Sequence, residues 1–315
     1  MSFRKILVIG ALGQIGTELT DALIHRWGPS QVVTADLKSQ GPKTSLIHES
    51  LDVLDFQKLK AITEKHDIQE IYHLAAALSA KAEQNPQWAW ELNLKSLLNV
   101  LEIAREKRLK VFWPSSMAAF GPSAPQPAPQ QCVMDPTSVY GISKVAGEGW
   151  CAWYHRHHGV DVRSLRFPGL ISWKTPPGGG TTDYAVDIFH AAVTHRPYTC
   201  FLSEHTRLPM MYMPDAIRAI QELMDAPASR LTVRHSYNLT AMSFTPKELA
   251  QAIREHIPSF SMDYKPDFRQ AIADSWPQQI DDHTARNDWG WKPLFTLSEL
   301  VREMIQGVQS IHHLS

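Results

Sequence analysis

Short apolar runs alternate with longer amphipathic segments along the first half of the chain. Six of the runs are typical of parallel strands covered on both faces, namely residues 5–9, 31–35, 46–51, 71–76, 111–113 and 162–167. Four segments repeat apolar residues with helical spacing, namely 14–27, 56–65, 88–107 and 138–157. This alternation predicts an α/β fold with a doubly wound parallel sheet of the Rossmann type.

The pattern changes after residue 171. Residues 175–183 form a polar, glycine-rich stretch of the kind that closes over a ligand, and short helices and strands follow. A helix is expected after Thr245, where a proline and Glu248 complete a capping box, and another from Thr296 or Ser298 to the chain end. We therefore expect a sheet domain over 1–171, with strands returned from later segments, and a smaller mixed α/β part over 172–315.

Composition narrows the class of protein. The 315 residues include 31 basic and 32 acidic side chains, so neither nucleic acid nor an anionic membrane surface is an expected partner. The 3 cysteines are far apart, which argues against disulfides and a metal site. No apolar run could span a bilayer, and too few residues precede the first strand for a signal peptide. A cytoplasmic protein is expected.

A glycine-punctuated turn joins the first strand to the first helix. Gly10, Gly13 and Gly16 would let the backbone approach a pyrophosphate at the helix N-terminus, beside Gln14 and Ile15. Asp36 ends the next strand, twenty residues beyond Gly16 and just before Leu37. Its carboxylate can accept hydrogen bonds from both adenosine ribose hydroxyls and would repel a 2′-phosphate. The first domain is therefore expected to bind NAD rather than NADP.

Asp52 and Val53 follow the third predicted strand and are well placed to contact the adenine. An equally good interpretation is an aspartate that caps a turn beside a core valine.

Tyr140 and Lys144 lie four residues apart in a predicted helix, so their side chains share one face. A cation about 4 Å from the phenol could lower its pKa by two or three units and turn Tyr140 into a general base. A lone pair of this kind would more often be a solvated surface pair. The pair Ser115 and Ser116, at the end of the preceding strand, favours the catalytic interpretation.

Together with the glycine turn and the Tyr140/Lys144 pair, the stretch from Ser115 to Gly121 resembles the extended short-chain dehydrogenase/reductase superfamily. The resemblance implies that Ser116 is catalytic beside Tyr140 and Lys144, and that Lys144 binds the nicotinamide ribose. Phe120 stands where the wider superfamily has tyrosine. Further cofactor-binding positions implied by the resemblance are Leu74, Ala75, Ala76, Asn93, Ser115, Pro168 and Leu170.

Later blocks resemble the short-chain L-threonine 3-dehydrogenases within that superfamily; these are residues 178–187, 208–213, 266–270, 272–277 and 281–282. The resemblance implies oxidation of the L-threonine 3-hydroxyl to 2-amino-3-oxobutanoate, with Tyr140 as base and Ser116 bonded to the developing carbonyl oxygen. It implies substrate contacts from Ser79, Ser116, Tyr140, Gly180, Thr181, Thr182 and Trp276, with Asp183 a further candidate.

Two other functions stay open. A nucleoside-diphosphate-sugar epimerase or dehydratase would place a diphosphate-binding arginine near Arg207. A non-catalytic NAD sensor on the same fold would have no reason to keep Ser116, Tyr140 and Lys144 together. The long helices at 88–107 and 138–157 carry apolar residues on more than one face, so we expect a homodimer built on them.

Overall fold

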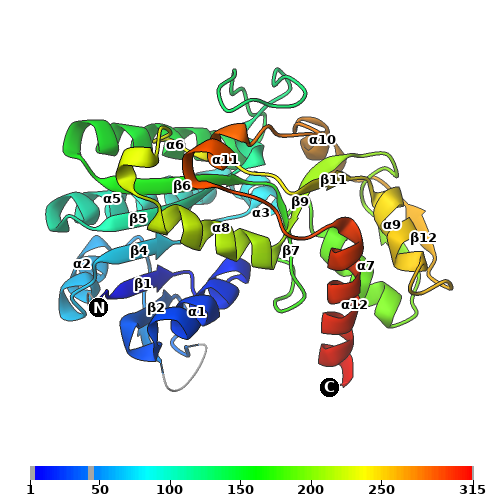
Figure 1. Ribbon diagram of the computed structural model, residues 1–315, viewed down its shortest axis with the longest axis horizontal. Helices are drawn as coiled ribbons and strands as arrows, with labels where there is room; N and C mark the ends of the chain where they lie inside the picture. The colour runs from blue at the N-terminus through cyan, green and yellow to red at the C-terminus, as the bar shows by residue number, and fades with distance from the viewer. Residues whose placement is uncertain (1–3, 42–45, 314–315) are drawn as a thin grey trace.

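The computed structural model describes residues 4–41 and 46–313, and its centre is a seven-stranded parallel sheet (Figure 1). From one edge to the other the strands run β3 (Ile47–Ser50), β2 (Val32–Asp36), β1 (Ile6–Ile9), β4 (Glu70–His73), β5 (Lys110–Ser116), β6 (Asp161–Phe167) and β10 (Tyr237–Asn238). Every neighbouring pair is parallel. The predicted doubly wound α/β fold is confirmed, and its strand order reverses between β1 and β4, where such sheets bind ligands.

Helices cover both faces of this sheet. One layer holds α1 (Gln14–Trp27), α8 (Met213–Asp225) and α11 (His283–Trp289), and the other holds α2 (Phe56–Lys65), α5 (Ser96–Lys107) and α6 (Val139–His158). Each layer has its own buried apolar cluster against the strands. Since α8, β10 and α11 come late in the chain, the C-terminal half completes the sheet domain as well as forming its own part.

Several element boundaries differ from the sequence prediction. The strand predicted over 71–76 ends at His73, and β5 continues past Trp113 to Ser116 because it lies between β4 and β6. The helix predicted over 88–107 is divided into α4 (Pro86–Trp90), a π-helical turn η2 (Glu91–Lys95) and α5. The sequence reading also missed α3 (Ser79–Gln84), which is too short to show helical periodicity.

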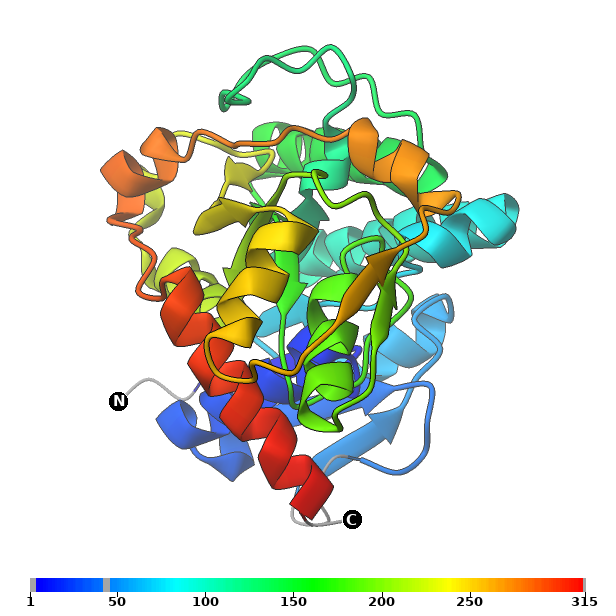
Figure 2. The ribbon, with the colours of Figure 1, turned by 90° about the vertical axis from the view of Figure 1, so that its right-hand side faces the viewer.

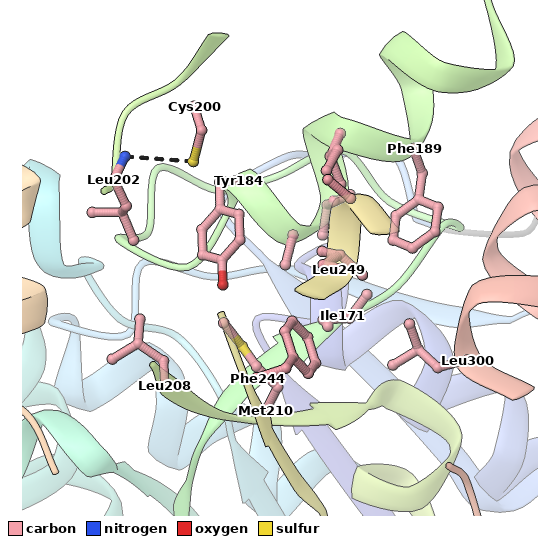
Figure 3. Close-up of a cluster of buried hydrophobic side chains, with 14 of the residues drawn as sticks. Ile171, Tyr184, Phe189, Cys200, Leu202, Leu208, Met210, Phe244, Leu249 and Leu300 are labelled. Atoms are coloured by element: carbon pink, nitrogen blue, oxygen red, sulfur yellow. Dashed lines mark hydrogen bonds between the residues drawn. The ribbon is translucent and has the colours of Figure 1, made fainter. Parts of the chain in front are cut away.

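The C-terminal part has its own core beside the sheet domain (Figure 2). Helices α7 (Tyr184–Val193), α9 (Pro246–Arg254) and α12 (Leu297–His313) pack around it. Two small sheets join them, one of β7 (Gly169–Ile171), β9 (Leu208–Tyr212) and β11 (Met242–Phe244), the other of β8 (Tyr198–Cys200) and β12 (Met262–Tyr264). Figure 3 shows Tyr184, Phe189 and Phe244 converging in this core.

Two predicted helix starts in this part are confirmed. Thr245 and Glu248 form the expected capping box at α9, and the Thr296 hydroxyl accepts from the Glu299 amide at the start of α12. Across residues 4–41 and 46–313, no helix is both long and apolar enough to cross a membrane.

Candidate active site

A cavity of about 610 Å³ opens at the carboxyl ends of the central strands, between the sheet domain and the C-terminal part. Many of the residues singled out from the sequence line it, from the glycine turn, from the ends of β4, β5 and β6, and from the loop before α7. They are Gly10, Gly13, Gln14, Ile15, Gly16, Leu74, Ala76, Ser79, Ser115, Ser116, Tyr140, Lys144, Pro168, Leu170, Gly180, Thr181, Thr182 and Trp276.

Close backbone contacts build the glycine turn at one end of the cavity. Gly10 has φ +79°, and a Cβ there would lie 2.8 Å from the Ala75 nitrogen. A Cβ on Gly16 would lie 2.1 Å from the Gly10 carbonyl oxygen, so α1 can start this close to β1 only with glycine. Gly13 caps α1 without a side-chain hydrogen bond, and the Gln14 Nε2 is buried without a partner in the described structure. Unpaired donors at a helix N-terminus suit a pyrophosphate.

Asp36 ends β2 beside this turn, and its Oδ2 accepts from the Leu12 amide at 3.1 Å. Neither Asp36 nor the exposed Leu37 lines the cavity, whereas the next residue, Lys38, does. One oxygen of the Asp36 carboxylate is therefore hydrogen-bonded to the glycine turn.

Asp52 and Val53 do not line the cavity either. The Asp52 Oδ1 accepts from the Leu54 amide at 3.0 Å, and Val53 is buried in the core with its carbonyl bonded to the Asn99 side chain. These contacts match the turn-capping and core roles that were the alternative to adenine binding.

Asn93 supports the site from behind. It sits in the π-helical turn η2, where its amide accepts from the Ala77 nitrogen at 2.7 Å and donates to the Ala77 oxygen at 3.2 Å. The same amide donates to the Ser143 hydroxyl on α6 at 3.1 Å. Asn93 thus joins the segment after β4 to α6 without lining the cavity, and Ala75 likewise lies behind the lining.

Ser116, Tyr140 and Lys144 meet at the middle of the cavity. The Ser138 hydroxyl caps α6, so Tyr140 lies in its first turn and Lys144 one turn further on the same face. The Tyr140 side chain hydrogen-bonds to Ser116 at the end of β5. The Lys144 Nζ donates to the Pro114 carbonyl at 2.6 Å and lies 5.3 Å from the centre of the Tyr140 ring.

The electrostatics of this pair differ from the sequence expectation. Burial raises the pKa of Tyr140 to about 12, although the hydrogen bond with Ser116 opposes the rise. Burial lowers the pKa of Lys144 to about 7, while the negative charge of Glu148 opposes that shift. The expected lowering of the phenol pKa by Lys144 is absent, and the Lys144 side chain donates to the Pro114 carbonyl. Additional positive charge in the cavity would lower the pKa of Tyr140.

A buried ion pair supports the strand ends and was not found from the sequence. The Glu148 carboxylate accepts from Arg166 at 2.8 and 2.6 Å and from the Ser115 hydroxyl at 2.6 Å. Glu148 follows Lys144 by one helical turn, a spacing that could have drawn attention to it. The bonds join α6, β5 and β6 directly behind Ser116.

The opposite end of the cavity is built by hydrogen bonds between α3 and the loop before α7. The buried Ser79 and Thr181 hydroxyls are 3.1 Å apart, and the Thr181 amide donates to the Ser79 hydroxyl at 3.3 Å. The Asp183 Oδ2 accepts from the amides of Gly179 and Gly180 at 2.8 and 2.7 Å. Burial raises the pKa of Asp183. Trp276, buried just after α10 (Arg269–Asp274), completes the wall.

The cavity also has lining residues that the sequence did not single out, including Lys38, Leu78 and Lys81, and it is lined by Thr175 from the predicted ligand-closing stretch. Arg207, the candidate diphosphate-binding residue of a sugar-nucleotide enzyme, does not line the cavity. Its guanidinium donates to the Ser243 carbonyl at 2.7 Å and pairs with Glu248 of the α9 capping box.

Comparison with known proteins identifies the class of protein that this fold and cavity define. The model of the NAD dependent epimerase/dehydratase family matches residues 6–239, so the chain belongs to that family and is an enzyme whose cofactor is NAD. An uncharacterized epimerase/dehydratase of Staphylococcus saprophyticus is 46% identical over 311 residues, which is 97% of each chain. The glycine turn, the uncapped start of α1 and the unpartnered Gln14 amide fit this cofactor.

Solved structures show a narrower similarity. The chain is 61% identical to a GalE-like L-threonine dehydrogenase from Cupriavidus necator in its holo form, with a TM-score of 0.95 over 96% of this chain and 99% of the other. A partial consensus L-threonine 3-dehydrogenase is 60% identical, with a TM-score of 0.96 over 97% and 99% of the two chains. A UDP-glucose 4-epimerase from Thermotoga maritima is 21% identical with a TM-score of 0.86, a likeness of fold alone.

Proposed function

We propose that the protein oxidises the 3-hydroxyl of L-threonine to 2-amino-3-oxobutanoate. The observation that carries the proposal is the meeting of Ser116, Tyr140 and Lys144 in one cavity with the glycine turn. Extensive similarity to structures named as L-threonine dehydrogenases supports this choice of substrate. A non-catalytic NAD sensor would not need the buried base and its cation.

Each residue of the set has a chemical role in this proposal. The Tyr140 oxygen takes the hydroxyl proton of the substrate while the hydrogen on the same carbon leaves as hydride. Ser116, bonded to Tyr140, donates to the oxygen as it becomes a carbonyl. Lys144 places its amino group one helical turn from the phenol, on the same face of α6. NAD, when bound, would supply the hydride acceptor and a positive charge close to Tyr140, which would lower the pKa of the phenol.

We propose a cofactor end and a substrate end for the rest of the cavity. Gly10, Gly13 and Gly16 would hold the pyrophosphate, and Asp36 would select the unphosphorylated ribose. At the other end, Ser79, Thr181, Thr182 and Trp276 would surround the substrate with the Gly180 backbone, and Asp183 supplies a carboxylate for its ammonium group. Pro168 and Leu170 would lie against the nicotinamide.

A spectrophotometric assay tests the proposal directly. Purified protein with NAD should form NADH on addition of L-threonine, and much more slowly with NADP in place of NAD. If L-threonine gives no reduction while a UDP-sugar is converted, the chain is a sugar-nucleotide enzyme and the proposal fails. The engagement of Arg207 by Ser243 and Glu248, away from the cavity, argues against that outcome.

We also propose that two copies of the chain form a homodimer through α4, η2 and α6. Trp90, Ile142, Trp150 and Trp153 are exposed there, and Trp88 lines both the active-site cavity and a groove of about 730 Å³ on this face. A cluster of exposed aromatic residues is typical of an interface. Sedimentation should give a dimer. A monomer would place this chain with the similar protein described as a monomeric L-threonine 3-dehydrogenase from a metagenome database, which is 48% identical.

A further inference from the structure

Among the residues that the structure describes, four charged ones line the cavity, at different places in it. The anion is Asp183, and the cations are Lys38, Lys81 and Lys144. Lys144 is buried and bonded to the Pro114 carbonyl, and Lys38 follows the Asp36 strand end beside the glycine turn. Lys81 is therefore the cation at the substrate end of the cavity.

The side chain of Lys81 runs along the loop before α7. Lys81 is the third residue of α3, which starts at Ser79. A Cβ built on Gly179 would lie 3.4 to 3.8 Å from the Cε, Cγ and Cδ of Lys81, so the aliphatic stem packs on this glycine. Within residues 4–41 and 46–313, nothing hydrogen-bonds or ion-pairs with its ammonium group, which leaves that charge available to a ligand.

The carboxylate of Asp183 approaches the same glycines. Its Oδ2 is fixed by the Gly179 and Gly180 amides, and a Cβ on Gly180 would lie 2.9 Å from its Oδ1. Burial raises the pKa of Asp183, whereas the amides of Gly180 and Gly179, the charge of Arg269 and, to the smallest extent, the charge of Lys81 oppose that rise. Gly179 and Gly180 therefore have an ammonium group and a carboxylate close by, and an α-amino acid carries the same two charges one carbon apart.

We propose that Lys81 binds the α-carboxylate of the amino acid substrate and so makes the site selective for substrates with a free carboxylate. This inference rests on the proposed function, which makes the substrate an α-amino acid. A hydrogen bond between two charged groups, here the Lys81 ammonium group and the substrate carboxylate, adds specificity as well as affinity. A 3-hydroxy compound whose carboxylate is replaced by a neutral amide would leave the ammonium group of Lys81 without a partner.

The test compares L-threonine with L-threoninamide in wild type and Lys81→Met. The methionine keeps the length of the stem and removes the charge. We expect the KM for L-threonine to rise about tenfold, with little change in kcat. The kcat/KM of L-threoninamide, or its Ki as a competitive inhibitor, should change less than threefold. Lys81→Arg, which keeps the charge, should stay close to wild type.

Lys58→Met is the matched control, because it removes an exposed lysine on α2, a helix from which no residue lines the cavity. The kinetic constants for L-threonine and for L-threoninamide should both stay at their wild-type values in this control. Unchanged L-threonine kinetics in Lys81→Met, or equal losses with L-threonine and L-threoninamide, would overturn the role of Lys81 while the proposed function stands. A wild-type protein inactive with L-threonine would overturn the proposed function, and the role of Lys81 with it.

Discussion

The two ends of the cavity are built in different ways. At the cofactor end, the main chain at Gly16 meets the main chain at Gly10 so closely that no side chain fits between them. At the substrate end, α3 and the loop before α7 are joined by side-chain hydrogen bonds such as that between Ser79 and Thr181. A close contact between two main-chain segments tolerates no larger residue at either position. A hydrogen bond between side chains can be removed or altered by one substitution. The cofactor end is therefore sterically fixed, and the substrate end is open to change by single substitutions.

Tyr140→Phe should have the largest effect, because it removes the proposed base where the two ends meet. We expect kcat to fall at least about 100-fold, while the Kd of NAD from fluorescence titration stays within a few-fold of wild type. Tyr154→Phe on the same helix, which loses a bond to Glu102 far from the cavity, serves as the control. Wild-type turnover in Tyr140→Phe would rule out the mechanism.

Gly16→Ala tests the rigidity of the cofactor end. The new methyl group would lie 2.1 Å from the Gly10 oxygen, and overpacking of this kind costs about 1–3 kcal/mol. We expect the Kd of NAD to rise about tenfold or more and the melting temperature to fall. In Gly149→Ala on α6, the methyl group meets nothing within 4 Å, so the variant should gain about 0.5–1 kcal/mol of stability. Normal NAD binding by Gly16→Ala would show that this end is less rigid than described.

Ser79→Ala tests the substrate end in the same way. It removes the hydroxyl that Thr181 contacts through its side chain and its amide, at a cost of about 1–3 kcal/mol. The KM for L-threonine should rise about tenfold, and the Kd of NAD should not change. A double-mutant cycle with Thr181→Val should show that the two effects are not additive. If Ser79→Ala weakened NAD as much as L-threonine, the two ends would not be separable.

Asp36→Asn tests the selectivity between NAD and NADP, because asparagine has nearly the shape of aspartate but no charge. The amide oxygen can still accept from the Leu12 nitrogen, so the turn should be retained while the charge is lost. The preference for NAD over NADP, measured as the ratio of kcat/KM values, should narrow by about three- to tenfold. An unchanged ratio would mean that Asp36 does not discriminate against the 2′-phosphate.

A last expected effect concerns stability rather than activity, and it is a pH dependence arising from Lys144. Its pKa is about 7 in the folded protein and 10.5 as the ordinary value, so the unfolded chain binds the extra proton between these limits. The free energy of unfolding should therefore rise with pH from about 7 towards 10 relative to Lys144→Met, which cannot titrate there. Parallel denaturation curves at several pH values check this. A difference between the two proteins that did not vary with pH would show that Lys144 titrates at its ordinary pKa.

The features that could be predicted best from the sequence are those that backbone sterics and helical periodicity determine. Gly10 and Gly16 are visible as a motif because their spacing reflects a steric requirement, and α1 and α2 begin and end at the predicted residues. The sequence did not reveal α3, whose six residues show no periodicity and whose partners lie about a hundred residues away. Glu148 and Arg166 are only 18 residues apart, but they lie on different elements and neither has a local pattern that points to the other, so their pairing was also hidden.

The chemistry of Tyr140 could be predicted only in part. Helical spacing correctly put Lys144 on the face of Tyr140, but spacing does not say where a long side chain ends. The Lys144 ammonium bonds to Pro114 because β5 extends three residues beyond its predicted end and brings that carbonyl into reach. Burial then dominates both pKa values, and burial is a property of the assembled fold.

The π-helical turn at Glu91–Lys95 has a consequence for protein engineering. Such a turn holds one residue more than a regular helix would, and it is less stable than the α-helical turn it replaces. Here the extra residue aims Asn93 at both polar groups of Ala77 and at Ser143. A deletion that restored a continuous α-helix would be attractive for thermostability and would rotate this amide out of the site. Stability and activity are therefore opposed at this turn, and a search for more heat-resistant variants should leave it unaltered.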